Sequence, residues 1–351
     1  MKIHEKYIKR CIELARNGLG STYPNPMVGS VIVHEEQIIG EGWHHRAGEA
    51  HAEVNAINSV SNEKLLKDAT IYVSLEPCSH YGKTPPCSDF IIAKGIKRVV
   101  IGTMDPFAEV AGRGIKKLME AGCEVNVGIL ETECQDLNKR FFTYHNQKRP
   151  YIILKWAQSL DGYIAPETKI EKRPVWITNK YSGQLVHKWR TEEAAILVGT
   201  STALADNPRL NVRNWTGNNP VRILIDKDLK VPVDSAIFSG NQRTVVLTAT
   251  AAEKDYPENV VLEQLSFSEN IAAAICEVLY KHEIQSVIIE GGSRTLQQFI
   301  DSGLWDEATV FTGNLRMHSG IAAPRFSGER ICKTAIQEDI LEIFTNQQTK
   351  L

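Results

Sequence analysis

Residues 51 to 87 carry a group of metal-ligand side chains that limits how this chain can fold more than any other feature. His51 offers an imidazole nitrogen, Cys78 and Cys87 offer thiolates, and Glu53 stands close to the histidine. Three protein ligands and one open position are typical of a catalytic zinc, whereas structural zinc sites close with four ligands. The fold must therefore bring three separated positions to one point and leave Glu53 free for proton transfer.

The order of these residues favours one kind of chemistry. A His-x-Glu pair followed by Pro-Cys and a second Cys is typical of zinc-dependent base deaminases, in which the glutamate is the general acid/base and not a ligand. Pro77 precedes Cys78 as in that motif, but eight residues, 79–86, separate the two cysteines instead of the usual two. The second thiolate is therefore expected after an inserted loop.

The flanking residues predict where the ligands lie. Residues 70–75 form an apolar run typical of a buried strand, so Cys78 is expected beyond the carboxyl end of that strand. Residues 88–94 form a short amphipathic segment. A helix that starts there would favour the thiolate form of Cys87 at its N-terminus.

A disulfide between the two cysteines is the competing interpretation. The chain starts Met-Lys-Ile-His without an apolar signal segment, and its seven cysteines are too few and too unevenly spaced for a secreted disulfide framework. We therefore expect reduced cysteines and a cytoplasmic protein.

Charge and length exclude several classes of protein. A net charge of −2 leaves no basic field to grip a nucleic-acid backbone, which favours a small-molecule partner. No apolar run approaches the roughly 20 residues that span a bilayer. At 351 residues the chain exceeds what one core usually supports, which predicts two domains.

Strands and helices alternate along the first part of the chain, which predicts a helix-flanked sheet. Helices are expected at residues 5–17, from residue 51, at 114–121 and at 131–144, and strands at 30–33, 37–40, 70–75, 98–102 and 124–127. The polar segment 146–150 ends in proline, so we place the boundary there, with one domain over residues 1–147 and another over 148–351.

The rest of the chain predicts a second α/β unit. Strands are expected at residues 151–157, 194–199, 221–226, 244–248 and 286–290, and helices at 179–190 and 269–281. Its sharpest local feature is Glu290-Gly291-Gly292, where a buried strand runs through glycines into a helix. Such a loop suits a phosphate, because glycines let main-chain N–H groups approach an anion at a helix N-terminus. A plain turn is the other interpretation of this spacing.

Longer motifs in both halves closely resemble the bifunctional deaminase-reductase family of riboflavin biosynthesis. In the first half they are Pro24-Asn25-Pro26-Met27-Val28-Gly29, residues 44–53 and residues 76–87, whose eight-residue spacer is itself characteristic. In the second half they include residues 155–162, Trp176-Ile177-Thr178, residues 204–208 and Glu290-Gly291-Gly292. The resemblance therefore covers nearly the whole chain.

The resemblance implies two successive reactions on one phosphoribosyl pyrimidine. The first domain would be a zinc-dependent deaminase with a cytidine-deaminase-like three-layer α/β/α fold, acting on 2,5-diamino-6-(5-phosphoribosylamino)pyrimidin-4(3H)-one. The second would be a dihydrofolate-reductase-like α/β domain that uses NADPH to reduce the ribosyl group of 5-amino-6-(5-phosphoribosylamino)uracil to ribityl. A homodimer or higher homo-oligomer is also implied, without nucleic-acid or membrane partners.

In the deaminase domain the resemblance assigns a metal set, a catalytic residue and a substrate set. Zn²⁺ falls on His51, Cys78 and Cys87, and Glu53 moves protons from water to the ring nitrogen and the leaving ammonia. Substrate contacts fall on Asn25, His44, His80, Lys83 and Asp105. For His80 and Lys83, which lie in the inserted loop, the alternative to a phosphate contact is a solvated loop.

In the reductase domain NADPH carries the hydride, so the protein mainly binds and aligns. The resemblance puts against the nucleotide Ala157, Trp176, Thr202, Asp206, Gly292, Ser293, Arg294, Thr295, Leu296, Gln297 and Gln298. It puts against the substrate Arg190, Leu210, Arg213 and Glu290, of which the arginines suit bidentate phosphate contact. A core position for Trp176 and a capping role for Asp206 are the structural alternatives.

Two departures from the family pattern are visible. Pro174 stands where many relatives carry a serine, which removes a hydroxyl expected to touch the substrate. Phe107 follows Asp105-Pro106 where relatives often continue with Asn-Pro.

Three other interpretations share parts of the pattern. A tRNA-editing deaminase would need basic and aromatic residues along a nucleic-acid path, and the charge balance and long spacer argue against it. A non-catalytic module with structural zinc would need a fourth ligand, for which His80 is nearest, and would leave Glu53 without a role. An enzyme with one degenerate half is the third, but motif residues are present in both halves, which favours two active domains.

Overall fold

The computed structural model describes residues 2–79, 85–107, 111–168, 175–251, 255–267 and 270–347. The chain divides into two compact units, Met1–Gln147 and Lys148–Leu351. Among the described residues, no helix combines the length and the apolar character needed to cross a bilayer.

The first unit is built on a five-stranded sheet of order β2-β1-β3-β4-β5. β1 pairs antiparallel with β2 and β3, and β4 pairs parallel with β3 and β5. The strands are β1 (Gly29–His34), β2 (Gln37–Trp43), β3 (Thr70–Leu75), β4 (Arg98–Thr103) and β5 (Glu124–Val127).

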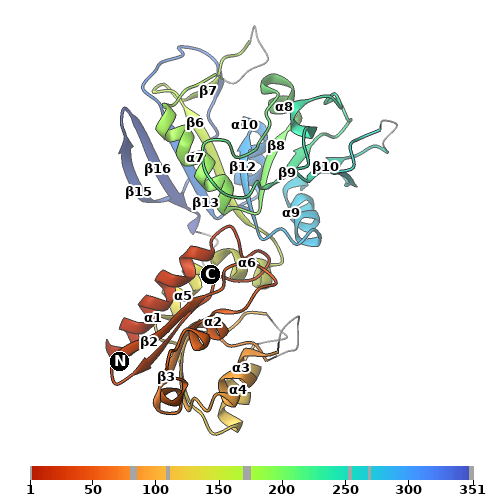
Figure 1. Cartoon of the computed structure of the whole chain (residues 1–351). Coiled ribbons are helices and arrows are strands. Elements are labelled where there is room, and N and C mark those ends of the chain that lie inside the picture. The colour runs from red at the N-terminus through yellow and green to blue at the C-terminus, as the bar shows by residue number, and fades with distance from the viewer. Residues whose placement is uncertain are drawn as a thin grey trace. The chain divides into compact units, whose positions relative to one another are not determined.

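Helices cover both faces of this sheet. In β3, Ile71 and Val73 pack with residues of α2, α3 and α4, whereas Tyr72 between them packs with residues of α1 and α5. Successive side chains of a strand point to opposite faces, so the unit is a three-layer α/β/α sandwich (Figure 1). Its helices are α1 (Lys2–Ala15), α2 (Ala52–Asn58), α3 (Cys87–Ala93), α4 (Arg113–Glu120), α5 (Glu131–Leu137) and α6 (Lys139–Gln147), with short 3₁₀ helices η1 (Arg16–Gly18) and η2 (Glu63–Asp68).

The single helix expected at residues 131–144 is wrong, because the chain breaks there into α5 and α6. Asn138 interrupts the helix with φ −105° and ψ 25°. Its buried side-chain amide accepts a hydrogen bond from Met27 N at 2.8 Å and donates one to Met27 O at 2.8 Å. A tertiary contact with the segment before β1 therefore overrides the local helical pattern.

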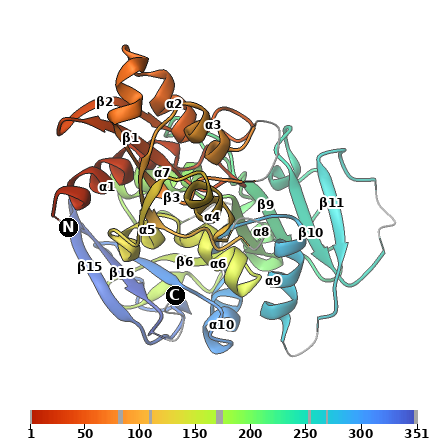
Figure 2. The same ribbon diagram turned by 90° about the horizontal axis from the view of Figure 1, so that it is seen from below.

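The second unit contains a nine-stranded sheet of order β11-β10-β9-β8-β12-β6-β13-β16-β15. Its strands are parallel from β11 to β13, and β16 and β15 form an antiparallel hairpin on β13. In Figure 2 this hairpin and the pair β10–β11 lie at opposite ends of the sheet. The strands are β6 (Tyr151–Gln158), β8 (Ala195–Gly199), β9 (Val221–Ile225), β10 (Thr244–Thr248), β11 (Val260–Gln264), β12 (Ser286–Gly291), β13 (Glu307–Thr312), β15 (Glu329–Ile336) and β16 (Asp339–Thr345), and β7 (Tyr163–Ala165) pairs separately with β14 (Ile321–Ala322).

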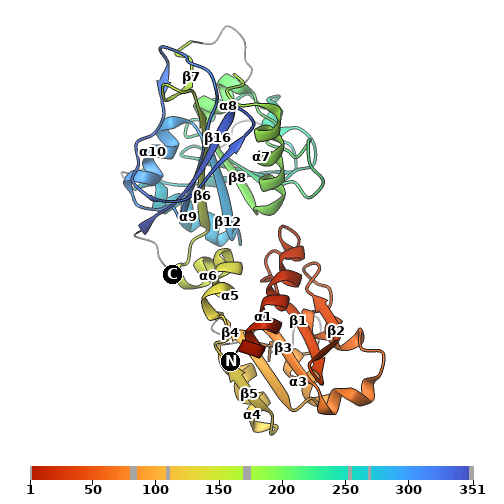
Figure 3. The ribbon, with the colours of Figure 1, turned by 90° about the vertical axis from the view of Figure 1, so that its left-hand side faces the viewer.

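Helices again cover both faces. Figure 3 shows α7 on one side of the sheet and α9 and α10 on the other. In β8, Leu197 joins the apolar cluster that contains residues of α9 and α10, whereas Ile196 and Val198 join a cluster with Ala203 of α8. The helices are α7 (Lys180–Glu192), α8 (Thr200–Asp206), α9 (Ile271–Lys281) and α10 (Ser293–Asp301), with the 3₁₀ helix η3 (Ala236–Phe238).

The parallel strands β6, β8 and β12 are adjacent and end at one edge of the sheet. This edge brings together Ala157 near the end of β6, Gly199 at the end of β8 and Glu290 near the end of β12. Ligands of α/β sheets bind beyond the carboxyl ends of strands, so the topology positions a candidate site here.

Candidate active sites

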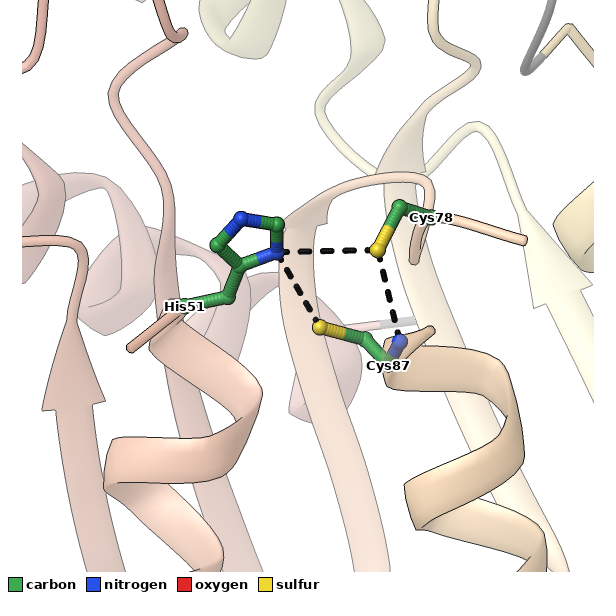
Figure 4. Close-up of side chains that lie close together, drawn as sticks. All are labelled: His51, Cys78 and Cys87. Carbon is green, nitrogen blue, oxygen red and sulfur yellow. Dashed lines mark hydrogen bonds between the residues drawn. The ribbon is translucent and has the colours of Figure 1, made fainter. Parts of the chain in front are cut away.

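Three metal-ligand side chains of the first unit converge on one point (Figure 4). The Nδ1 atom of His51 lies 3.2 Å from Sγ of Cys87 and 3.6 Å from Sγ of Cys78. All three ligand atoms lie within 4.8 Å of one another. The set expected from the sequence is thus assembled by the fold.

Two helix starts and one strand end hold these ligands. His51 is the N-cap residue of α2, Cys87 is the first residue of α3, and Cys78 follows β3. The main-chain N–H of Cys87 donates to Sγ of Cys78 at 3.3 Å. The hydrogen bond from the Cys87 thiol, together with that from His51, lowers the pKa of Cys78 well below its ordinary value. One sulfur therefore ionises readily, as a metal ligand must.

Glu53 lies in the first turn of α2 and is 3% exposed. Burial raises the pKa of its carboxyl to about 7. The carboxyl interacts with the thiol of Cys87 but is not one of the three converging ligands. It therefore stands beside the candidate metal position, where a proton-transfer group is needed.

The donor set fits zinc. Two thiolates and one imidazole are a known three-ligand catalytic set, which leaves one position for water or substrate. Within the described part of the chain, no other histidine, cysteine or carboxylate joins this set. His80 and Lys83 lie outside the described residues, as does Pro174.

Asn25 and His44 form a pair next to the metal ligands. Asn25 Nδ2 can only donate, so it donates to Nε2 of His44 at 3.0 Å, and Nδ1–H of His44 donates to Ala50 O at 3.1 Å. The His44 ring meets that of His51 edge-on, with centroids 5.3 Å apart. Burial lowers the pKa of His44, which agrees with a neutral ring in this pair.

Asp105 lies in the segment after β4 and is 8% exposed. Its Oδ1 atom accepts from Phe107 N at 2.8 Å. Burial raises the pKa of this carboxyl to about 7, because few polar groups replace its lost hydration. Asp105 is therefore a buried acid beyond the carboxyl end of β4, at the same edge of the sheet as Cys78, which follows the parallel strand β3.

A second cluster lies at the strand ends of the second unit. Arg190 of α7 holds Glu290 of β12 with two hydrogen bonds, Nε to Oε1 at 3.3 Å and Nη2 to Oε2 at 2.8 Å, and its Nη1 donates to Asn211 O at 3.2 Å. Burial alone would raise the pKa of Glu290, but the charges of Arg190 and Lys155 outweigh it and lower the pKa to about 2. The arginine thus orients a charged carboxylate.

Arg213 and Leu210 approach the cluster from one loop. Arg213 Nη1 donates to Asn211 Oδ1 at 2.8 Å, which places the guanidinium beside that of Arg190. Leu210 differs from the other three predicted substrate residues, because its side chain is buried in the apolar cluster with Leu224. Its side chain therefore belongs to the apolar core and not to the charged cluster.

Two residues of this cluster, the half-buried Lys155 and the buried His187, were absent from the predicted site set. Lys155 Nζ lies 3.8 Å from Glu290 Oε1, and His187 Nδ1 accepts from Arg213 N at 3.2 Å. Lys155 carried a signal, since it is a lone charge in the apolar run of residues 151–157. His187 is three residues before Arg190 and shares its helix face, which no local motif reveals.

Three of the predicted nucleotide residues, Thr202, Gly292 and Thr295, lie close together at two glycines. A Cβ atom on Gly199 would lie 2.8 Å from Thr295 Oγ1, and one on Gly292 would lie 3.2 Å from Thr202 Oγ1. Helix α10 starts directly after Gly292, and no described side chain caps it. The open main-chain N–H groups and the close-packed glycines suit a phosphate of NADPH. Asp206 ends α8, and Trp176 is 71% exposed rather than part of the core.

Comparison with known proteins assigns the family. The model of the cytidine and deoxycytidylate deaminase zinc-binding region matches residues 1–103, and the RibD C-terminal domain matches residues 150–331. The riboflavin biosynthesis protein RibD of Aquifex aeolicus is 42% identical over 324 residues, which cover 92% of this chain and 90% of its own. The chain belongs to the RibD family. RibD of Escherichia coli is 38% identical, covering 88% of this chain and 86% of its own.

Solved structures of RibD proteins extend this finding. The diaminohydroxyphosphoribosylaminopyrimidine deaminase/5-amino-6-(5-phosphoribosylamino)uracil reductase of Thermotoga maritima has a TM-score of 0.88 and 37% identity, covering 98% of this chain and 99% of its own. Acinetobacter baumannii RibD also has a TM-score of 0.88, with 32% identity, and covers 99% of both chains.

These matches confirm the predicted fold class and bifunctional character. The first unit has the cytidine-deaminase-like fold, and the second has the dihydrofolate-reductase-like fold of RibD reductase domains. The chain is a deaminase and reductase of riboflavin biosynthesis, with zinc and NADPH as its cofactors. The matched region, residues 1–103, spans His51, Cys78 and Cys87.

Proposed function

We propose that this chain carries out two successive reactions on one phosphoribosyl pyrimidine. It deaminates 2,5-diamino-6-(5-phosphoribosylamino)pyrimidin-4(3H)-one and then reduces the ribosyl group of 5-amino-6-(5-phosphoribosylamino)uracil to ribityl. The observation that carries the proposal is the convergence of His51, Cys78 and Cys87 beside the buried Glu53. The name of the Thermotoga protein, which has 37% identity over nearly the whole chain, supports the choice of substrates.

In the deaminase, His51, Cys78 and Cys87 hold zinc and Glu53 is the general acid/base. Zinc, when bound, supplies Lewis acidity that makes water a better nucleophile near neutral pH. The Glu53 carboxylate takes a proton from the attacking water and returns it to the ring nitrogen and the departing ammonia. Its burial excludes competing solvent from that exchange.

The pyrimidine is held by Asn25, His44 and Asp105. His44 is fixed by its bond to Ala50 O and in turn orients the amide of Asn25. Among the described residues, no group bonds the side-chain oxygen of Asn25, so it is available to accept from the base. The ribose phosphate is assigned to His80 and Lys83, which lie outside the described residues.

In the reductase, NADPH supplies the hydride, and the chain binds and aligns the two reactants. The nucleotide contacts are assigned to Ala157, Trp176, Thr202, Asp206 and the stretch Gly292, Ser293, Arg294, Thr295, Leu296, Gln297 and Gln298. Support comes from the open N-terminus of α10 and the glycines packed against Thr202 and Thr295.

The substrate of the reductase is assigned to Arg190, Leu210, Arg213 and Glu290. Lys155, Arg190 and Arg213 bring three positive charges against the one negative charge of Glu290. Such an excess favours an anionic group of the substrate. Because three donors of Arg190 are already bonded within the protein, we assign the phosphate to Arg213 and an orienting role to Arg190.

Each domain catalyses one of the two reactions, with the deaminase in residues 1–147 and the reductase in residues 148–351. All seven cysteines are unpaired, which favours a reducing compartment such as the cytoplasm. We also propose a homo-oligomer formed through the reductase domain, which analytical ultracentrifugation tests.

One assay tests both reactions. The purified protein is incubated with the diaminopyrimidine substrate, with and without NADPH, and the products are analysed by mass spectrometry. Without NADPH we expect only the deaminated ribosyl compound, and with NADPH the ribityl compound. Unchanged substrate under both conditions would contradict the proposed deamination.

A further inference from the structure

Glu76 is a buried carboxylate with no part in the mechanism above. It lies directly after β3, two residues before Cys78, and is 4% exposed. Four main-chain N–H groups donate to it. They are Asp105 N at 3.3 Å and Gly112 N at 3.0 Å to Oε2, and Gly114 N at 2.9 Å and Ile115 N at 3.2 Å to Oε1. These bonds use nearly all of the acceptor capacity of a carboxylate.

Three of the four donors belong to the start of α4. Gly112 is its N-cap residue and has no side chain to cap the helix. Glu76 therefore satisfies N–H groups that would otherwise lie unpaired, and its negative charge faces the positive end of the helix. The N-cap side chain usually accepts hydrogen bonds from the first turn of a helix, but in α4 Glu76, which follows β3, accepts them instead.

The packing between the two segments leaves no room for adjustment. A Cβ atom on Gly114 would lie 2.0 Å from Pro77 O, so the start of α4 rests directly on the residue between Glu76 and Cys78. Glu76 N also donates to Thr103 O at 3.0 Å, which extends the strand pairing past β3. Glu76 and Pro77, the two residues before Cys78, are thus held by β4 on one side and by α4 on the other.

The same carboxylate reaches the substrate side of the site. Its Oε2 atom accepts from the main chain of Asp105, whose own carboxyl is buried and is assigned to the pyrimidine. One group therefore connects the segment that carries Cys78 with the segment that carries Asp105.

We propose that Glu76 is a positioning residue of the deaminase, which fixes Cys78 and Asp105 relative to each other by binding four main-chain N–H groups. The inference rests on the proposed function for the role of Asp105. The position of Cys78, and so the geometry at the metal, does not depend on which substrate is used.

The test replaces Glu76 with glutamine in the full-length holoenzyme. Glu76→Gln keeps the shape but exchanges one acceptor oxygen for a donor NH₂, which leaves two buried N–H groups without a partner. We expect deaminase kcat/KM to fall about 10- to 100-fold, the effect of losing hydrogen bonds to a charged group. Reductase kinetics of the same chain should not change. The matched control is Glu120→Gln, at an exposed glutamate of α4, for which no change is expected.

A second readout does not require the substrate. In protein loaded with cobalt in place of zinc, the absorption bands report the geometry of the thiolate ligands, and Glu76→Gln should alter them while the Glu120→Gln spectrum matches the wild type. A wild-type spectrum together with wild-type deamination in Glu76→Gln would overturn the proposal. If the wild type fails to deaminate the pyrimidine, the proposed function fails, while the cobalt spectrum still decides the role of Glu76.

A third variant covers loss of folding. If circular dichroism shows that Glu76→Gln has lost the structure of the deaminase domain, Glu76→Asp takes its place, since it keeps both oxygens on a side chain one methylene shorter. Compared with the wild type, we expect shifted cobalt bands and a lower deaminase kcat in Glu76→Asp, because the shorter side chain cannot keep all four hydrogen bonds. Unaltered bands and kcat in Glu76→Asp would overturn the proposal.

Discussion

The two sites of this chain collect their residues in opposite ways. In the first unit Nδ1 of His51 lies 3.2 Å from Sγ of Cys87 and 3.6 Å from Sγ of Cys78, and a cation would complete this set. In the second unit the charged side chains already pair with one another within the protein, as Arg190 does with Glu290 through two hydrogen bonds. Loss of one atom should therefore disable the first site, whereas loss of one group should weaken the second by degrees.

The largest expected effect is removal of a metal ligand. Cys87→Ala leaves two ligands, which do not hold a catalytic zinc, so we expect the variant to lose its zinc and its deaminase activity to fall to background. Its reductase activity should equal that of the wild type. Metal analysis and separate assays of the two reactions check this. Ser88→Ala, at the neighbouring buried residue, is the control and should retain zinc. Full zinc in Cys87→Ala would show that another residue completes the set.

Removing the proton-transfer group while the metal stays bound tests the first site in a second way. Glu53→Gln keeps a side chain of the same size but cannot transfer the proton, so deamination should fall roughly 10²–10⁴-fold while zinc content stays near one per chain. An ammonia-release assay with metal analysis measures both. Glu49→Gln, outside the converging set, is the matched control. A Glu53→Gln protein without zinc would indicate that Glu53 supports the ligands instead.

The graded response of the second site is tested at Arg213. Arg213→Ala should lower reductase kcat/KM about 10- to 100-fold, the effect of losing a charge-assisted hydrogen bond, mainly through the KM of the pyrimidine. The KM of NADPH should hardly change. Arg213→Lys should recover part of the loss, because it restores the charge without the planar fork. Steady-state kinetics with each substrate varied in turn decide this. A defect limited to NADPH would move Arg213 to the nucleotide site.

The contrast between the sites also explains what the sequence could reveal. The proposed zinc ligands lie within residues 51–87, each near a strand end or a helix start, so the residue types and the local pattern predicted their chemistry and their placement. The split at Asn138 was not predictable in this way, because its cause is a pair of hydrogen bonds to Met27, far away in the sequence.

The residues of the second site could be predicted only from the family resemblance, and even that prediction omitted Lys155 and His187. Glu290, His187 and Arg213 come from a strand, a helix and a loop that only the folded sheet brings together. The hairpin β15–β16 was also missed, because β15 is an edge strand with mostly exposed residues and lacks the alternation of a half-buried strand. Local pattern finds residues that share a segment, and tertiary contacts decide the rest.

His187 offers the smallest test of the contrast, through the pH dependence of stability. Burial and the charges of Arg190 and Arg213 lower its pKa from 6.5 to about 4, with Glu290 opposing them and Lys155 adding to them. Between these two values the unfolded chain binds a proton that the folded chain does not, so stability falls as the pH falls from 6.5 towards 4.

His187→Asn removes this titration and keeps an acceptor near the position of Nδ1. From pH 7 to pH 4.5 the variant should therefore lose less free energy of unfolding than the wild type, by on the order of 2 kcal/mol. Urea unfolding followed by tryptophan fluorescence measures this, because Trp43 is the sole tryptophan outside the second unit. Glu290, whose pKa is about 2, stays ionised from pH 7 to pH 4.5 in both proteins. Equal losses would therefore mean that burial and the surrounding cations do not hold His187 neutral.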